Sequence, residues 1–114
     1  MDSILLSVKK VLGMNPEYEE AFDVDLIMHI NSVFSILKQL GVGPTSGFTI
    51  QDDTAKWSDF TTNLNLDMIK SYIVAKVKLI FDPPASSSVA DAYKAYISEF
   101  EWRINVEVDP NEES

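Results

Sequence analysis

Few residues in this sequence could perform acid–base or nucleophilic chemistry. His29 is the only histidine, and the absence of cysteine excludes a thiol nucleophile, a disulfide scaffold and the usual zinc ligand sets. Asp25 lies one helical turn before His29 and could orient its imidazole. The sequence nevertheless offers no complete set of nucleophile, base and orienting acid around them, so a histidine at the edge of a packed helix face is the favoured interpretation. We therefore expect no catalytic residue and no enzyme activity.

Metal, cofactor and phosphate sites also lack their usual patterns. Neither a calcium-binding EF-hand loop nor a His-Glu-x-x-His metal motif occurs, and Asp52-Asp53 reads as a turn signal rather than a pair of catalytic acids. Gly41-Val-Gly-Pro44 lacks the further glycines and the lysine of a phosphate loop. Lys70, Lys76 and Lys78 scatter around a predicted helix instead of forming a nucleic-acid-binding stripe. We predict no bound metal and no cofactor.

The remaining pattern is that of a small all-α bundle of about four helices. Glycines and prolines are few and fall between long stretches with helical spacing of apolar residues. Gly13 and Gly41 end the first two of these stretches, and Asp82-Pro83-Pro84 ends the third, for which Asn65 is a plausible N-cap. The predicted helices cover residues 3–12, 23–40, 65–81 and 88–105, the last opened by a capping box over Ser88-Val-Ala-Asp91.

A long irregular connection separates the second and third predicted helices. It runs from Gly41 to Asn63, which is longer than a compact bundle normally needs, and therefore indicates a functional loop or an unrecognised element. Phe48-Thr49-Ile50 could form a short strand. We expect Trp57 and Phe60 to anchor the connection to the core.

The third predicted helix is apolar on two sides. One stripe comprises Leu66, Ile69, Ile73, Val77 and Ile80, and a second comprises Met68, Tyr72, Ala75 and Leu79. Such a helix must be packed on both sides, either by the other helices or by another subunit. Met68, Tyr72 and Leu79 are therefore candidate interface residues.

The last predicted helix carries a tryptophan on its outer side. Val89, Tyr93, Tyr96, Phe100 and Ile104 form the expected inward stripe, and Trp102 projects roughly 160° away from it. Trp102 is then either a protein–protein anchor or packed under the long connection, and the sequence leaves both open. Arg103 can pair with Glu99 one turn earlier or act as a partly buried anchor.

The chain ends in an acidic segment. Val106 and Val108 alternate with polar residues, so a short strand or extended arm and a continued helix remain equally open. Residues 109–114 are acidic and lack the apolar residues of a core. We divide the chain into a helical domain, residues 1–105, and an acidic C-terminal arm, residues 106–114, in which Val106 and Val108 are candidate docking residues.

Charge limits the partners of this 114-residue chain. Its 18 acidic and 9 basic side chains give a net charge of -9, which disfavours binding to the phosphates of DNA or to an anionic membrane. No apolar run approaches the ~20 residues of a membrane span, and the N-terminus does not resemble a secretory signal. We expect a protein made in the cytoplasm with no membrane partner.

Three segments together resemble the small head-tail connector, or adaptor, proteins of long-tailed bacteriophages. They are Phe22-Asp-Val-Asp-Leu-Ile-Met-His-Ile-Asn-Ser-Val-Phe34, Lys76-Val-Lys-Leu-Ile-Phe-Asp-Pro-Pro84 and Glu99-Phe-Glu-Trp-Arg-Ile-Asn105. Each segment alone can be explained as a helix cap, a stop or a helix face, and the order and spacing of the three carry the resemblance. It extends over nearly the whole chain, from the first helix to Asn105.

The resemblance implies a non-enzymatic virion or prophage protein made in the host bacterial cytoplasm. Such proteins form a ring, typically dodecameric, below the phage portal and extend the DNA channel toward the stopper or tail-completion protein and the tail. Portal, stopper and further copies of the chain are then the partners, and DNA passes through without specific binding. The residues after Asn105 become a candidate portal-docking arm.

Another class of function fits the same composition. A small acidic helical regulator could bind a host or phage protein, for instance by imitating the charge of DNA. A hydrolase using His29 is disfavoured because its other catalytic groups are missing.

Overall fold

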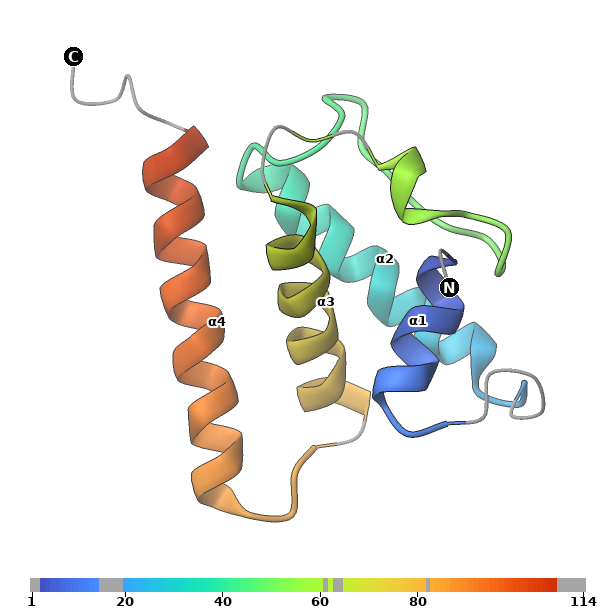
Figure 1. The fold of residues 1–114 in the computed structure, drawn as a ribbon, viewed down its shortest axis with the longest axis vertical. Helices are drawn as coiled ribbons and strands as arrows, with labels where there is room; N and C mark the ends of the chain where they lie inside the picture. Colours follow the sequence, from blue (N-terminus) through green and yellow to red (C-terminus); the bar gives the residue numbers. More distant parts are fainter. Residues whose placement is uncertain (1–2, 15–19, 61, 63–64, 82, 109–114) are drawn as a thin grey trace.

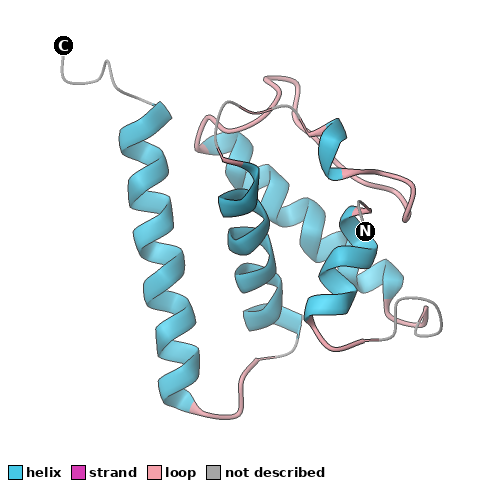
Figure 2. Ribbon diagram, in the orientation of Figure 1, coloured by secondary structure: helices cyan, strands magenta, loops and turns pink. Residues whose placement is uncertain are grey.

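The computed structural model describes residues 3–14, 20–60, 62, 65–81 and 83–108, with side chains up to Ile104. These described residues form four α-helices in the predicted order (Figure 1). They are α1 (Ile4–Val11), α2 (Asp23–Gln39), α3 (Leu66–Phe81) and α4 (Ser87–Val108), with a short 3₁₀ helix, η1 (Trp57–Asp59), between α2 and α3. The described residues contain no strand (Figure 2), so the all-α fold class is confirmed.

The helix ends follow local capping chemistry. Ser3 caps α1 by accepting the Leu6 amide at 3.2 Å, and Asn65 caps α3 by accepting the Asp67 amide at 2.8 Å. The start predicted for α4 was wrong by one residue, because the helix begins at Ser87. The hydroxyl of Ser86, rather than a box over Ser88 and Asp91, accepts the Val89 amide at 3.4 Å.

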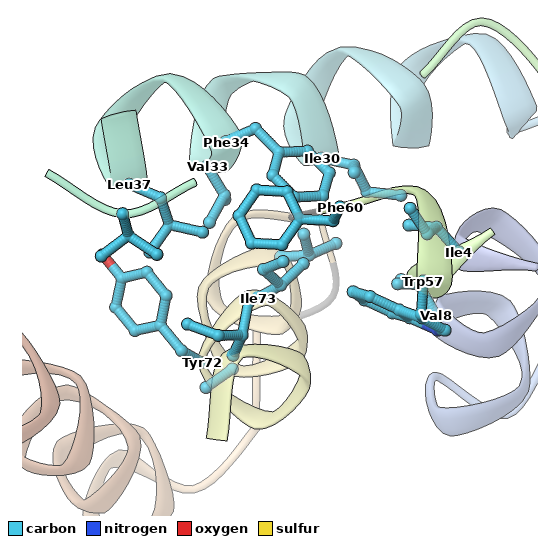
Figure 3. Packing of buried hydrophobic residues seen from close by; sticks show 14 of the residues in the cluster. Ile4, Val8, Ile30, Val33, Phe34, Leu37, Trp57, Phe60, Tyr72 and Ile73 are labelled. Carbon is cyan, nitrogen blue, oxygen red and sulfur yellow. The ribbon is translucent and has the colours of Figure 1, made fainter. Parts of the chain in front are cut away.

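The core lies where α2 and α3 pack together, with α1 and η1 closing one end of it (Figure 3). The residues that α2 contributes to the core follow the predicted helical spacing: Leu26, Ile30, Val33 and Leu37 are fully buried. The side chain of Lys9 is also buried, and its ammonium lies 2.8 Å from a carboxylate oxygen of Asp23. This ion pair joins α1 to the first turn of α2.

The long connection is held against the bundle by side chains. The side-chain amide of Asn31 donates to the Ile50 carbonyl at 2.9 Å and accepts the Ile50 amide at 2.8 Å. These two hydrogen bonds satisfy the backbone groups of Ile50 that a neighbouring strand would otherwise pair. The predicted strand at 48–50 is therefore wrong. Trp57 and Phe60 are buried, as expected, and the Trp57 indole donates to the Ser7 hydroxyl at 3.1 Å.

Helix α3 is packed on both sides, as its two stripes predict. It contacts α2 on one side and α4 on the other. Tyr72, from the second stripe, stacks on Phe100 of α4 with ring centres 4.6 Å apart. Ile80, assigned to the first stripe, is instead largely exposed at the end of the helix.

Helix α4 lies at the edge of the molecule beside α3 (Figure 1). Among the α4 side chains that the structure describes, the buried ones are Ile97, Phe100 and Ile104, so the predicted inward stripe is correct only toward the C-terminal part of that range. Val89 and Tyr96 were expected inside but are 46% and 40% exposed. The backbone remains helical through Val108, which decides between the alternatives left open for that segment in favour of helix.

Candidate interaction surface

Trp102 is exposed on the outer side of α4. Two thirds of its surface, 66%, is accessible, and the helix turns it away from Ile97, Phe100 and Ile104. Packing under the long connection, the alternative open in the sequence, is therefore wrong. Trp102 shares this side with small or polar exposed residues, and we call the set Asp91, Ala95, Ser98 and Trp102 the α4 ridge.

An apolar groove lies between α3 and α4. It has a volume of about 500 Å³ and reaches the last residue of α1. Its walls are mainly apolar, and the small side chains of Ser71 and Ala92 leave room between the larger ones. Residues of this α3–α4 groove include Val11, Ser71, Val74, Ala92, Tyr93 and Tyr96. The groove lies beside the N-terminal half of α4, where Val89 and Tyr96 are exposed, whereas the buried Phe100 and Ile104 lie further along the helix.

A second hollow lies further along the same two helices. Met68 of α3 and Arg103 of α4 both line it. Arg103 donates to Glu99 at 2.7 Å, which confirms the predicted pair, and its side chain is 60% exposed. Arg103 is therefore not a buried anchor within the subunit.

Tyr72 lies inside the subunit. Its side chain is fully buried, and its hydroxyl donates to the Glu101 carboxylate of α4 at 2.6 Å. Lys76 of α3 lies 3.6 Å from the same carboxylate oxygen. Burial, together with the hydrogen bond and the negative charge of Glu101, raises the pKa of Tyr72 above its ordinary value. Tyr72 therefore fastens α4 to α3 and offers no surface to a partner in this structure.

The other candidate interface residues lie apart. Met68 is 39% exposed at the start of α3, whereas Leu79 is only partly exposed near its other end. The backbone of Val106 and Val108 belongs to α4, and their side chains lie outside the described residues. The structure thus brings Met68 and Arg103 to one hollow and leaves Trp102 on a separate side of α4.

The residues considered for chemistry have structural partners. His29 is partly buried with its ring centre 6.3 Å from that of Phe81. Asp52 accepts the amide and hydroxyl of Thr54, and these hydrogen bonds lower the pKa of the Asp52 carboxyl within the turn. Among residues 3–14, 20–60, 62, 65–81 and 83–108, no cluster of histidine and carboxylate side chains could hold a metal ion.

The lysines of α3 also act within the subunit. The Lys70 ammonium lies 5.4 Å from the centre of the Trp57 ring, and Lys76 faces Glu101 and the Tyr72 ring. These contacts favour structural roles over a stripe for nucleic acid. What the described surface offers instead is apolar: the α3–α4 groove, Trp102, and other exposed side chains such as Val24 and Met28 of α2.

Comparison with known families identifies the family of the chain. A family model described as phage connector protein matches residues 4–111, nearly the whole chain. The chain belongs to the phage connector protein family. No curated protein and no solved structure matches it.

The family places this connector protein among structural components of the phage virion that contact other head or tail proteins. Within the described helices, none has the length and apolar character needed to cross a membrane. For a structural protein of this kind, the functional residues are those of its contact surfaces. The sequence predicts Trp102 as a candidate contact residue, but it missed the α3–α4 groove, whose walls combine the consecutive helices α3 and α4 with the end of the distant α1.

Proposed function

We propose that this connector protein forms a ring, dodecameric in the virion, below the phage portal, and extends the DNA channel toward the stopper and tail. The observation that carries this proposal is the exposed Trp102 on a helix that is covered on only one side. In a family of virion proteins that work by contact, such a residue is best explained as part of an interface.

Energetics favour that explanation. An indole is large and mostly apolar, and exposing 66% of it to water forgoes the stabilisation that burial would give. Tryptophan is enriched among the few residues that dominate the binding energy of protein interfaces. A subunit that keeps Trp102 in water when alone gains that energy when it assembles.

The charge of the chain fits a channel that DNA must slide through. A net charge of -9 repels the phosphates of DNA rather than binding them. We propose accordingly that DNA passes through the ring without specific binding. The segment from Val106 to Ser114 is our proposed portal-docking arm.

The test is assembly with the portal protein of the same phage. The purified chain is mixed with portal, and complexes are separated by size and imaged by negative stain. Trp102→Ala should weaken assembly by about 2 kcal/mol, roughly thirtyfold in affinity, and leave the helical circular dichroism signal unchanged. Met28→Ala is a matched control, because Met28 is also exposed, at 62%, but lies on α2.

Two outcomes oppose the proposal. Unimpaired assembly of Trp102→Ala would remove Trp102 from the interface. A monomer that ignores portal but captures a DNA-binding protein would instead support the acidic regulator that imitates DNA charge.

A further inference from the structure

We propose that the α3–α4 groove receives the α4 ridge, led by Trp102, from a second copy of this chain. The inference rests on the proposed self-assembly and adds the two surfaces that meet in it. One copy supplies the groove and its neighbour supplies the ridge.

The two surfaces complement each other in shape. The groove offers about 500 Å³ between small residues such as Ser71 and Ala92. On the ridge, Trp102 projects beside Ala95 and Ser98, whose short side chains allow a second helix to approach closely. A bulky aromatic residue flanked by small ones fits an open apolar groove.

The two surfaces also complement each other in chemistry. The groove walls are formed mainly by apolar side chains, with Lys70 at one edge, while the ridge combines an indole with the carboxylate of Asp91. Chains with a net charge of -9 repel each other in general. The ammonium of Lys70, which also lies over the Trp57 ring, and the carboxylate of Asp91 give the contact one pair of opposite charges that offsets part of this repulsion.

Geometry requires the two surfaces to come from different molecules. At about 100° per residue, Trp102 lies about 120° around α4 from Tyr96, which lines the groove. Because ridge and groove share one rigid helix, a subunit cannot insert its own Trp102 into its own groove. Contact between unlike surfaces of identical chains is head-to-tail, and such contacts close into rings when the rotation permits.

Engineered thiols test the contact directly, because the native chain has no cysteine. Ser98→Cys labels the ridge and keeps Trp102, and Ser71→Cys labels the groove; both serines are exposed. The two variants are mixed at high protein concentration and treated with a short bismaleimide, which joins two nearby thiols. We expect cross-linked dimers from the mixture, few from either variant alone, and a ladder of higher oligomers from the double variant.

Ser46→Cys is the matched control for the groove label. Ser46 is also an exposed serine, but it lies in the connection between α2 and α3, which contributes no residue to the groove. Mixed with Ser98→Cys, it should give only background cross-linking.

A second variant blocks the groove without touching the ridge. Ala92→Arg fills the groove from an exposed helix position that tolerates a long side chain. It should reduce cross-linking between the Ser98 and Ser71 labels by at least about tenfold. Adding Trp102→Ala should reduce it little further, because both changes remove the same contact.

The outcomes separate this inference from the proposed ring. Rings with portal but no Ser98–Ser71 cross-link would overturn the groove contact and leave the ring standing. Cross-links that stop at dimers in the double variant would show paired, symmetric contacts and overturn the head-to-tail arrangement. Absence of both rings and cross-links would overturn both proposals.

Discussion

The attachment of α4 to α3 should depend on pH through Tyr72. Its buried hydroxyl donates to Glu101, and its pKa is raised, so the folded protein keeps the proton at pH values where an unfolded tyrosine loses it. The stabilisation is complete below the ordinary tyrosine pKa of about 10. This contribution to stability is lost as pH rises from there toward the raised pKa of Tyr72.

The size of the effect follows from linkage between proton binding and folding. Well above pH 10, the folded protein holds one proton that the unfolded chain has lost. The free energy of unfolding then falls by about 1.4 kcal/mol for each further pH unit. Tyr72→Phe removes the ionisable hydroxyl and should abolish this part of the decline. At neutral pH, Tyr72→Phe should lower the free energy of unfolding by about 1.5 kcal/mol, which is near the lower end of the range for a hydrogen bond to a charged group. The lower end applies because the Glu101 side chain is 34% exposed and can be hydrated.

The assay is urea unfolding followed by circular dichroism, from neutral pH to about pH 11. The difference in stability between the native chain and Tyr72→Phe should shrink by about 1 kcal/mol between about pH 10 and pH 11, because the unfolded tyrosine is only half ionised at the start of this range. Tyr96→Phe is the control, since it retains Tyr72 and should retain the decline. A difference that stays constant across this range would refute the coupling between Tyr72 and the attachment of α4.

Two further changes test the fold and one tests a surface pair. Asn31→Ala should lower the free energy of unfolding by about 2 to 3 kcal/mol, because it leaves the buried backbone amide and carbonyl of Ile50 without their partners. Phe100→Ala should cost about 3 to 4 kcal/mol by opening a cavity against Tyr72, measured by the same urea unfolding. Glu99→Gln should change stability by less than about 0.5 kcal/mol, because its pair with Arg103 is exposed.

Matched controls keep these results interpretable. Ser32→Ala, at the exposed position next to Asn31, should be nearly neutral. A neutral Asn31→Ala would show that Asn31 does not hold the long connection. A neutral Phe100→Ala would mean that α4 is attached by other contacts, and a large loss in Glu99→Gln would give that surface pair a structural role.

Much of the fold is predictable from local chemistry. Ser3, Gly13 and Asn65 mark helix ends through backbone capping that depends only on neighbouring residues. The outward direction of Trp102 follows from helical geometry alone. The double apolar character of α3 predicts that it is packed on two sides.

The errors arise where packing between distant segments decides the outcome. Val89 and Tyr96 have the spacing of an inward stripe, but α3 covers only part of α4 and leaves them exposed. For the stripe that contains Tyr72, the sequence left a helix of the same chain and another subunit as alternatives, and in the subunit α4 covers Tyr72. The strand expected before Ile50 is replaced by Asn31, a polar residue whose role appears only once α2 lies beside the connection.

The central claim, that this connector protein forms a ring on the portal, is tested most directly by imaging purified portal mixed with the purified chain. We predict portal particles that carry one additional coaxial ring, whose mass corresponds to twelve copies of the chain and which needs roughly thirtyfold more protein to form with Trp102→Ala. Portal particles unchanged by an excess of correctly folded chain would contradict the account.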